Sequence, residues 1–258
     1  MINFEALARS ALNWQDAQPF PHLIVDNFIE LDLAKQLEAD FPSFESDIWQ
    51  KYSNAIEEKK LSNIWNHFPE TTYRFFDYLN SDSFVKKLSR ILFNGDVLFS
   101  DPGLNGGGWH VHKTGGKLNT HLDYSIHPKL KKQRKINIII YMNSEWEPEW
   151  GGHLGLWGNE SAEKPGALVK QIEPVFNRAV IFDTTCNSWH GLPDPLMSPD
   201  GQLRKSLAIY YLCEPPEYVD QRGKALFAPT QEQANDEKVL ELIKKRSSVE
   251  SASDVYEK

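Results

Sequence analysis

Hydrophobic and polar positions alternate in different ways along the chain. Up to about residue 94 the apolar positions recur mainly at helical spacing, which predicts a helix over residues 31–41 and two more over residues 69–93. Ser81 and Ser83 are the candidate N-caps of the last of these helices. The short apolar stretch at residues 22–25 predicts a strand.

From residue 95 the pattern changes to short apolar runs separated by Gly, Pro and Asn, which is typical of strands joined by turns. The predicted strands cover residues 97–99, 108–112, 121–125, 136–142, 153–157, 169–172, 179–183, 188–192 and 204–213. Strands of this number and spacing favour a β-sandwich or jelly roll. After residue 216 the β pattern stops, and one amphipathic helix is expected over residues 235–246, before a polar tail.

We therefore expect a mainly β, α+β protein that forms a single domain over residues 1–258. Residues 1–94 would support a β core at residues 95–216, and residues 217–258 would form a helical tail.

Charge and composition narrow the class of protein. The 258 residues carry a net charge of −8, and the densest basic run, at residues 129–135, is expected to be a solvated loop, so no nucleic-acid surface is predicted. Cys186 and Cys213 are the only two cysteines, which argues against a disulfide framework. We find no signal-peptide pattern and no apolar run long enough to span a bilayer, and we expect a cytoplasmic protein with no membrane partner.

Two polar residues in the predicted strand at 121–125 are candidate metal ligands. His121 and Asp123 are two positions apart, so they share one face of a strand. His190, in the segment at residues 187–192, is the best candidate for a third ligand. Two histidines and one carboxylate form the facial triad of non-haem Fe(II) sites. A single His-x-Asp occurs often by chance, so these residues alone also allow a hydrogen-bonded histidine beside a surface aspartate.

The other histidines are weaker candidates. His110 and His112 also share a strand face, but no glutamate follows them as in a cupin site, so we expect them in the core or behind the ligands. His127 precedes a proline in the predicted exit loop and is expected outside the metal site. Cys186 lacks a partner cysteine for a structural zinc site.

The strand at residues 204–213 adds a second polar feature. Arg204, Ser206, Ala208 and Tyr210 share one face, so a guanidinium and a hydroxyl point together into the interior. A buried arginine needs an anionic partner, which the carboxylate of a dicarboxylic cosubstrate would supply. A structural salt bridge to an acidic side chain is the alternative.

The ordered motifs together resemble the Fe(II)/2-oxoglutarate-dependent oxygenases, and most closely their prolyl 4-hydroxylase-like branch. The resemblance covers roughly residues 95–216 and includes His121-x-Asp123, the apolar strand that ends at Tyr141, Gly151-Gly152, Trp189-His190-Gly191 and Arg204-x-Ser206. It implies a double-stranded β-helix of the jelly-roll, cupin-like type, with N-terminal helices and a C-terminal helix.

The resemblance also implies the site and its chemistry. His121, Asp123 and His190 would hold Fe(II), and Arg204, Tyr141 and Ser206 would bind 2-oxoglutarate. With O2, such an enzyme hydroxylates an unactivated C–H bond and releases succinate and CO2; desaturation and epimerisation are further outcomes of this chemistry, and a requirement for ascorbate is left open. One departure is that the tyrosine expected ten residues before the first ligand is Val111 here; His112, Trp109 and Asn137 are candidate replacements.

The substrate is not fixed by these motifs. A small metabolite, an amino acid, a sugar or a peptidyl residue all fit, and Tyr124, Trp109, Trp157 and Tyr210, with Trp189, are the aromatic residues expected near the pocket. The alternatives to an oxygenase are a zinc hydrolase and a non-catalytic or zinc-binding cupin-like protein that binds a metabolite. The oligomeric state is not predicted.

Overall fold

Two antiparallel β-sheets form the centre of the protein in the computed structural model, which describes residues 1–252 and 254–256. The larger sheet runs in the order β1 (His22–Val25), β11 (Ala179–Asp183), β8 (Gln133–Tyr141), β13 (Arg204–Cys213), β5 (Gly108–His112), β3 (Glu57–Ser62) and β2 (Gln50–Ser53), with β4 (Phe99–Ser100) beside β13 and β6 (Lys117–Leu118) beside β3. The smaller sheet runs in the order β10 (Lys164–Ile172), β9 (Leu154–Ser161), β12 (His190–Gly191), β7 (His121–Leu122) and β14 (Leu226–Phe227).

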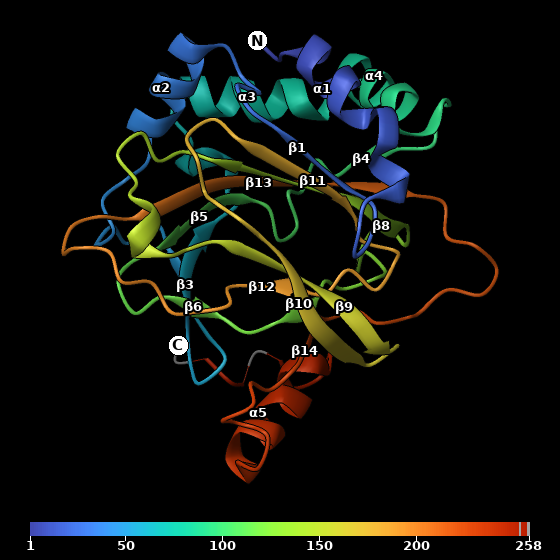
Figure 1. The fold of residues 1–258 in the computed structure, drawn as a ribbon. Helices are drawn as coiled ribbons and strands as arrows, with labels where there is room; N and C mark the ends of the chain where they lie inside the picture. Colours follow the sequence, from blue (N-terminus) through green and yellow to red (C-terminus); the bar gives the residue numbers. More distant parts are fainter. Residues whose placement is uncertain (253, 257–258) are drawn as a thin grey trace.

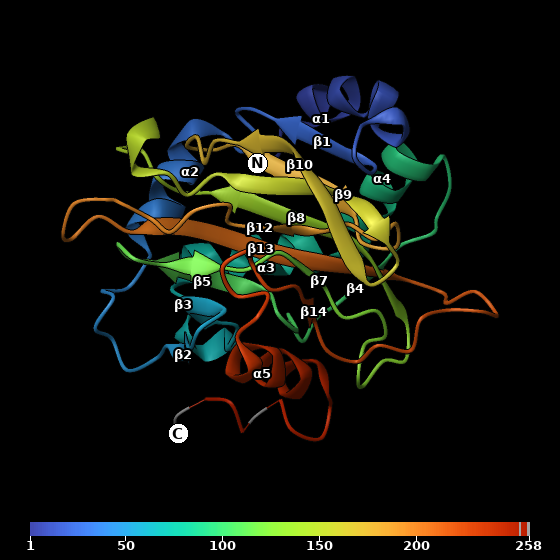
Figure 2. The ribbon, with the colours of Figure 1, turned by 60° about the horizontal axis from the view of Figure 1, so that its bottom comes forward.

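The helices lie on the outside of this pair of sheets. Figure 1 shows four of them gathered on one side of the molecule: α1 (Phe4–Ser10), α2 (Leu31–Ala39), α3 (Glu70–Asn80) and α4 (Asp82–Phe93). The last helix, α5 (Glu237–Ser247), lies on the opposite side, beneath the smaller sheet, and comes forward in Figure 2. Short 3-10 helices cover Ala11–Asp16, Trp65–His67 and Pro148–Trp150. Among the helices that the structure describes, none combines the length and the apolar character needed to cross a bilayer.

Side-chain alternation gives the larger sheet two different faces. On β8, Ile136, Ile138 and Ile140 join the apolar cluster formed with α1–α4, whereas Asn137 and Ile139 line a cavity between the sheets. On β13, Leu207, Ile209 and Tyr211 likewise pack toward the helices, and Arg204, Ser206, Ala208 and Tyr210 line the cavity. The helices thus bury one face, and the other face is left for the site.

Most of the predicted elements are confirmed. Strands β1, β5, β11 and β13 have the expected bounds, and the Ser81 hydroxyl accepts a hydrogen bond from the Phe84 amide at the start of α4 (3.3 Å). The strand expected at residues 97–99 begins only at Phe99, because the amides of Val97 and Leu98 donate to the Ser89 hydroxyl instead of pairing with a neighbouring strand.

Two expectations about polar segments need correction. The hairpin of β2 and β3 was not among the predicted strands, since its charged sequence lacks an apolar alternation. The basic run at residues 129–135 is not a solvated loop throughout: residues 129–131 are exposed, but β8 begins at Gln133 and buries Arg134. The arginine is buried because the turn ends earlier than the charge pattern suggested.

Candidate active site

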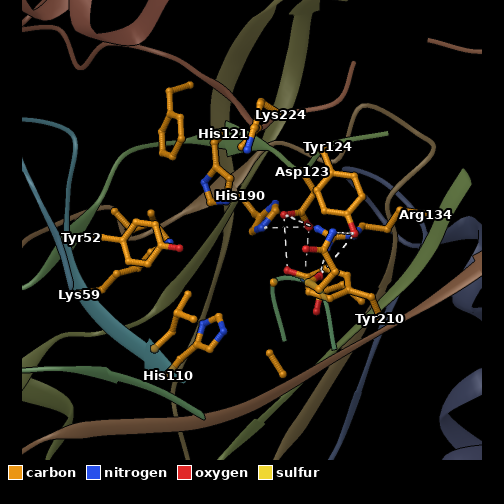
Figure 3. Close-up of a pocket in the computed structure, with 18 of the residues that line it drawn as sticks. Tyr52, Lys59, His110, His121, Asp123, Tyr124, Arg134, His190, Tyr210 and Lys224 are labelled. Atoms are coloured by element: carbon orange, nitrogen blue, oxygen red, sulfur yellow. Dashed lines mark hydrogen bonds and ion pairs between the residues drawn. The ribbon is translucent and has the colours of Figure 1, made fainter. Parts of the chain in front are cut away.

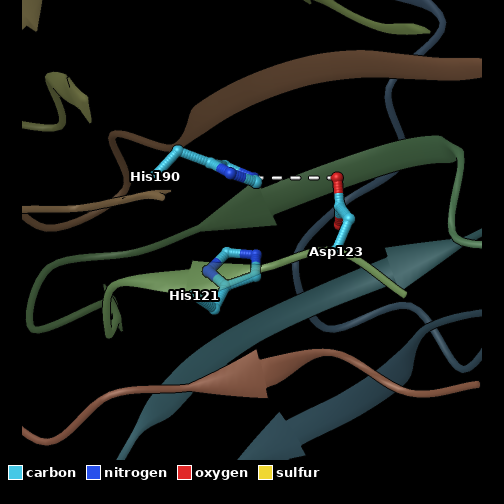
Figure 4. Close-up of side chains that lie close together, drawn as sticks. All are labelled: His121, Asp123 and His190. Atoms are coloured by element: carbon cyan, nitrogen blue, oxygen red, sulfur yellow. Dashed lines mark ion pairs between the residues drawn. The ribbon is translucent and has the colours of Figure 1, made fainter. Parts of the chain in front are cut away.

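The side chains of His121, Asp123 and His190 meet at the cavity between the sheets (Figure 4). Their ligand atoms all lie within 4.8 Å of one another, and His190 Nε2 is 3.9 Å from Asp123 Oδ2. His121 and His190 are direct cross-strand partners in the pairing of β7 with β12, which places the two imidazoles side by side with centroids 4.3 Å apart. Sixty-nine positions of sequence therefore separate two residues that a single backbone pairing brings together.

Backbone hydrogen bonds fix both imidazoles in the same way. Nδ1 of His121 lies 3.0 Å from the Asn119 carbonyl oxygen, and Nδ1 of His190 lies 2.8 Å from the Ser188 carbonyl oxygen. A ring that donates from Nδ1 carries its lone pair on Nε2, which is the arrangement that ligating histidines adopt. Burial and the neighbouring His190 lower the pKa of His121 to about 3, and burial lowers the pKa of His190, so both rings are neutral and free to bind a cation.

The Asp123 carboxylate is held ionised and in one orientation. Burial by itself raises its pKa, but Arg134 and the two histidines more than offset this, and the net pKa of Asp123 is lowered. Arg134 Nη1 is 3.3 Å from Oδ1, and the Asn137 amide donates to Oδ2 (3.3 Å). These contacts keep the carboxylate turned toward the histidines, and two neutral imidazoles with one carboxylate fit a divalent iron ion.

Arg134 is itself held between two aromatic rings. Its guanidinium carbon lies 3.5 Å from the centroid of Tyr124 and 3.3 Å from that of Tyr210, and Nη2 donates to the Asn105 carbonyl (2.5 Å). Figure 3 shows this stack on one side of the triad, with the arginine directed at Asp123. The stack and the ion pair together compensate a charge that would otherwise be buried without a partner.

The second polar centre of the cavity is Arg204, at the start of β13. Only 4% of this residue is exposed, and its Nε donates to the Gly152 carbonyl (2.7 Å). Among the described residues no carboxylate forms an ion pair with it, which removes the structural salt bridge as an explanation for the buried charge. A side chain at Gly152, where φ is +73°, would come within 2.9 Å of Arg204, so the glycine allows the backbone to approach the guanidinium.

Tyr141 and Ser206 lie beside Arg204. They are cross-strand partners of β8 and β13, and the Arg204 guanidinium carbon is 5.0 Å from the Tyr141 ring centroid. The Tyr141 hydroxyl is buried without a hydrogen-bond partner among the described residues, and burial raises its pKa, so it remains a donor. Tyr141 shares its strand face with Asn137 and Ile139, which line the cavity. A guanidinium that has no carboxylate partner and a phenol that has no hydrogen-bond partner, among the described residues, are suited to an entering carboxylate.

The cavity that contains these groups has a volume of about 650 Å³, within the usual range for a small-molecule site. It is lined by residues of both sheets, of the segment at 221–227 and of α5. The metal triad and Arg204 open into the same space, so a ligand of the metal can also reach the guanidinium.

The segment that carries these site residues is similar to a known protein family. Residues 107–212 match the family model described as the 2OG-Fe(II) oxygenase superfamily, and this range contains the triad and Arg204. This segment belongs to the 2OG-Fe(II) oxygenase superfamily. Fe(II) and 2-oxoglutarate are the metal and the cosubstrate named in the description of that family.

Prolyl hydroxylases are among the proteins to which this chain is similar. Prolyl 3-hydroxylase OGFOD1 of Xenopus laevis is 25% identical over 221 residues, which cover 80% of this chain and 38% of the relative. The Mus musculus protein of the same name is 22% identical over 219 residues, or 80% of this chain and 36% of the relative. The chain thus spans less than two fifths of the length of these relatives.

Solved structures of the same fold include two prolyl hydroxylases. One, from Trichoplax adhaerens in complex with a peptide fragment of the hypoxia inducible factor oxygen degradation domain, has a TM-score of 0.56 and 20% identity and covers 81% of this chain and 90% of its own. The other, a prolyl-4-hydroxylase of Pseudomonas putida, has a TM-score of 0.55 and 17% identity and covers 81% and 100%. The expected double-stranded β-helix fold is therefore confirmed.

The aromatic residues expected near the substrate divide into two groups. Tyr124 and Tyr210 line the cavity. Trp109 does not: it points to the opposite face of β5 and packs against Phe41, Trp49 and Phe68 beneath the helices. Trp157 and Trp189 lie in a separate apolar cluster outside the cavity lining. The structure thus corrects the placement of Trp109, Trp157 and Trp189, which serve packing.

Three further histidines that the sequence analysis considered, and Val111, lie outside the triad. His110 and His112 line the cavity without joining the triad, and burial lowers the pKa of His110 to about 3 and that of His112 well below its ordinary value. His127 Nε2 lies 3.4 Å from Asp101, away from the metal ligands. Val111 is buried in the helix-side core, so its position on β5 does not face the cavity. Of the candidate replacements for the missing tyrosine, His112 and Asn137 line the cavity and Trp109 does not.

Several site residues escaped the sequence analysis. Arg134 was not predicted because it lies in a basic run that was expected to be a solvated loop. Phe227 was not predicted because its segment has no strand pattern, yet its ring stacks on His121 (4.9 Å, 20° between planes). Arg222 donates from Nη2 to the Asp123 carbonyl (3.1 Å), although its segment follows a Pro-Pro turn. For Arg134 a signal existed: it lies two residues before Ile136 and three before Asn137, at the start of the strand that forms the cavity wall.

Proposed function

We propose that this protein is an Fe(II)- and 2-oxoglutarate-dependent dioxygenase that hydroxylates an unactivated C–H bond and releases succinate and CO2. The observation that carries the proposal is the presence, in one cavity, of a His-Asp-His triad and a buried Arg204 without a carboxylate partner among the described residues. A metal triad or a buried arginine alone is compatible with several functions. Together they fit a dicarboxylate that chelates the metal at one end and pairs with Arg204 at the other.

In this proposal His121 and His190 would bind Fe(II) through Nε2, and Asp123 would bind it through its carboxylate. The carbonyls of Asn119 and Ser188 hold the rings by their Nδ1 atoms, so the ligands are oriented before the metal arrives. Three protein ligands leave coordination positions for 2-oxoglutarate and O2.

The second carboxylate of 2-oxoglutarate would meet Arg204, with the hydroxyls of Tyr141 and Ser206 as additional donors. A charge-assisted pair in a buried site contributes both affinity and orientation. Bound Fe(II), 2-oxoglutarate and O2 would supply the oxidation: one oxygen atom of O2 enters the C–H bond, the other enters succinate, and 2-oxoglutarate loses CO2. The chain orients the two reactants, keeps the ligands deprotonated and limits the access of water to the cavity.

The relatives suggest a substrate class without fixing it. Two relatives are named prolyl 3-hydroxylases, and the Trichoplax adhaerens structure contains a peptide, so a peptidyl proline is one candidate substrate. At 25% identity or less, and with under two fifths of the relatives' length, a free small molecule is an equal candidate.

Succinate release tests the proposal. Purified protein with Fe(II), O2 and 2-oxoglutarate would be screened against free amino acids, proline-containing peptides and sugar nucleotides, and any oxidised product identified by a mass increase of one oxygen atom. We expect at least one substrate to raise succinate release above the uncoupled rate. Zinc in place of iron should give no succinate; a reaction that zinc supports would instead favour a zinc hydrolase.

A further inference from the structure

One wall of the cavity is strongly basic in an otherwise acidic protein. Of the described residues that line the cavity, six are lysine or arginine and only Asp123 is acidic, while the whole chain has a net charge of −8. Two of the six already have a use, because Arg134 pairs with Asp123 and Arg204 faces the proposed cosubstrate position. The other four are Lys59, Lys131, Lys224 and Arg246.

Three of these cations, Lys59, Lys224 and Arg246, form what we term the basic wall. They come from β3, the segment before β14, and α5, so three parts of the chain contribute one positive surface. In Figure 3, Lys224 lies beside His121, and Lys59 lies on the side of the triad opposite Arg134 and Tyr210. Lys59 and Lys224 therefore lie on the side of the triad that the Arg134 stack leaves open, and Arg246 lines the same cavity.

The basic wall has fewer negative than positive charges. Glu57, fully buried, lies 3.2 Å from Lys59 Nζ and 2.8 Å from Arg246 Nε, and one carboxylate neutralises only one of these two cations. Lys224 forms no ion pair with any described carboxylate, although it is half-buried and faces the cavity. The Nε2 atom of His110, also buried on this side, has no hydrogen-bond partner in the described part of the chain. A positive surface of this kind attracts and binds anions.

We propose that the basic wall binds an anionic group of the substrate, a carboxylate or a phosphate, while the C–H bond to be oxidised lies at the metal. The inference rests on the proposed oxygenase function and adds to it the substrate class. Lys224 is the main contact because its ammonium group has no competing carboxylate, and Lys59 and Arg246 add the excess charge that Glu57 does not neutralise. The chain as a whole is negatively charged and does not attract an anionic substrate, so the substrate is recognised inside the cavity.

Anion binding can be measured without turnover. Metal-free protein and protein loaded with Zn(II) and 2-oxoglutarate would each be titrated with inorganic phosphate, followed by its ³¹P line width, and with acetate, followed by its methyl ¹H line width. We expect saturable binding of at least one probe, and the tighter of the two identifies the group that the substrate carries. Since one charge-assisted contact is lost, Lys224→Ala should weaken binding about tenfold, and Lys224→Arg should restore most of it.

Matched variants make the result specific. Lys129→Ala removes the same charge from an exposed position outside the cavity lining and should leave the affinity unchanged. Lys224→Glu should abolish binding, and the thermal unfolding midpoint of each variant shows whether it is folded. Failure of both probes to bind, or equal affinity in the wild type and Lys224→Ala, would overturn the inference.

The two proposals can fail separately. If the protein binds neither Fe(II) nor 2-oxoglutarate, the oxygenase function fails, and the titration of metal-free protein still decides whether the anion site exists. If metal and cosubstrate bind but matched neutral and anionic substrates release succinate equally, the oxygenase function stands and the anion site is refuted.

Discussion

The guanidinium of Arg134 lies 3.3 Å from Asp123 Oδ1, and its stack between Tyr124 and Tyr210 leaves it no other carboxylate at this distance among the described residues. Oδ2, the other oxygen, is then the one nearer to His190. A basic side chain that looked like part of a surface loop thus holds the carboxylate of the proposed metal site.

Removing this arginine should destabilise the metal-free protein through Asp123. Arg134→Met leaves a buried carboxylate without its cation, which costs about 3–5 kcal/mol. In an Asp123→Asn background the same substitution should cost much less, because no charge remains to compensate. Urea unfolding of the wild type, both single variants and the double variant gives the coupling energy. An equal cost in the two backgrounds would show that Arg134 acts only through its packing.

Arg204 should determine the affinity for 2-oxoglutarate and not that for the metal. Arg204→Met removes a charge-assisted contact and should raise the KM for 2-oxoglutarate roughly 10- to 100-fold. Metal affinity, titrated separately under anaerobic conditions, should stay within about threefold of the wild-type value, because Arg204 is not one of the proposed metal ligands. A loss of metal binding would instead give Arg204 a structural role.

Tyr141 should make a smaller contribution at the same end of the cosubstrate. Tyr141→Phe keeps the ring that packs beside Arg204 and removes only the hydroxyl, so we expect a KM for 2-oxoglutarate about 2- to 10-fold higher. The combined Arg204→Met and Tyr141→Phe variant should fall short of the product of the two effects if both donors contact one carboxylate. If the two effects on the KM multiply in full, Arg204 and Tyr141 contact different groups of the cosubstrate.

Glu57 should make stability depend on acid pH. Burial by itself raises its pKa, but Lys59 and Arg246 lower it to about 2 from an ordinary value of 4.5. A carboxyl whose pKa is lower in the folded state stabilises the fold above pH 4.5 and loses this contribution as the pH falls toward 2. The linked contribution is about 3 kcal/mol. Between pH 4.5 and pH 2 the unfolding free energy of Glu57→Gln should change by about 3 kcal/mol less than that of the wild type. An unchanged pH dependence would show that Glu57 does not have a lowered pKa in the folded state.

The sequence predicted the parts of the fold that alternation determines. Strands β5, β11 and β13 are buried on one or both faces, so their apolar periodicity is strong and their bounds were predicted correctly. The same rule, applied to β5, would have placed Trp109 opposite His110 and excluded it from the cavity. His121 and Asp123 were predicted from their spacing and His190 as the best third ligand, whereas the pairing of β7 with β12 that joins the two histidines was not predicted, because β12 is only two residues long.

The parts that the sequence did not predict depend on contacts between distant segments. Lys59, Lys224 and Arg246 face one cavity because β3, the segment before β14 and α5 meet there, and no local pattern of residues encodes that meeting. Arg134 is buried because its cation has a partner 11 positions earlier in the chain, and charge patterns predict exposure when partners are unknown.

In the proposed oxygenase, His121, Asp123 and His190 hold Fe(II) in a form that chelates 2-oxoglutarate. Fe(II) followed by 2-oxoglutarate would be added to the wild type and to Asp123→Ala under anaerobic conditions, and the visible spectrum recorded. We expect a weak metal-to-ligand charge-transfer band in the wild type that is absent from Asp123→Ala. A wild-type protein without the band, or an Asp123→Ala variant with the same band, would contradict this proposal.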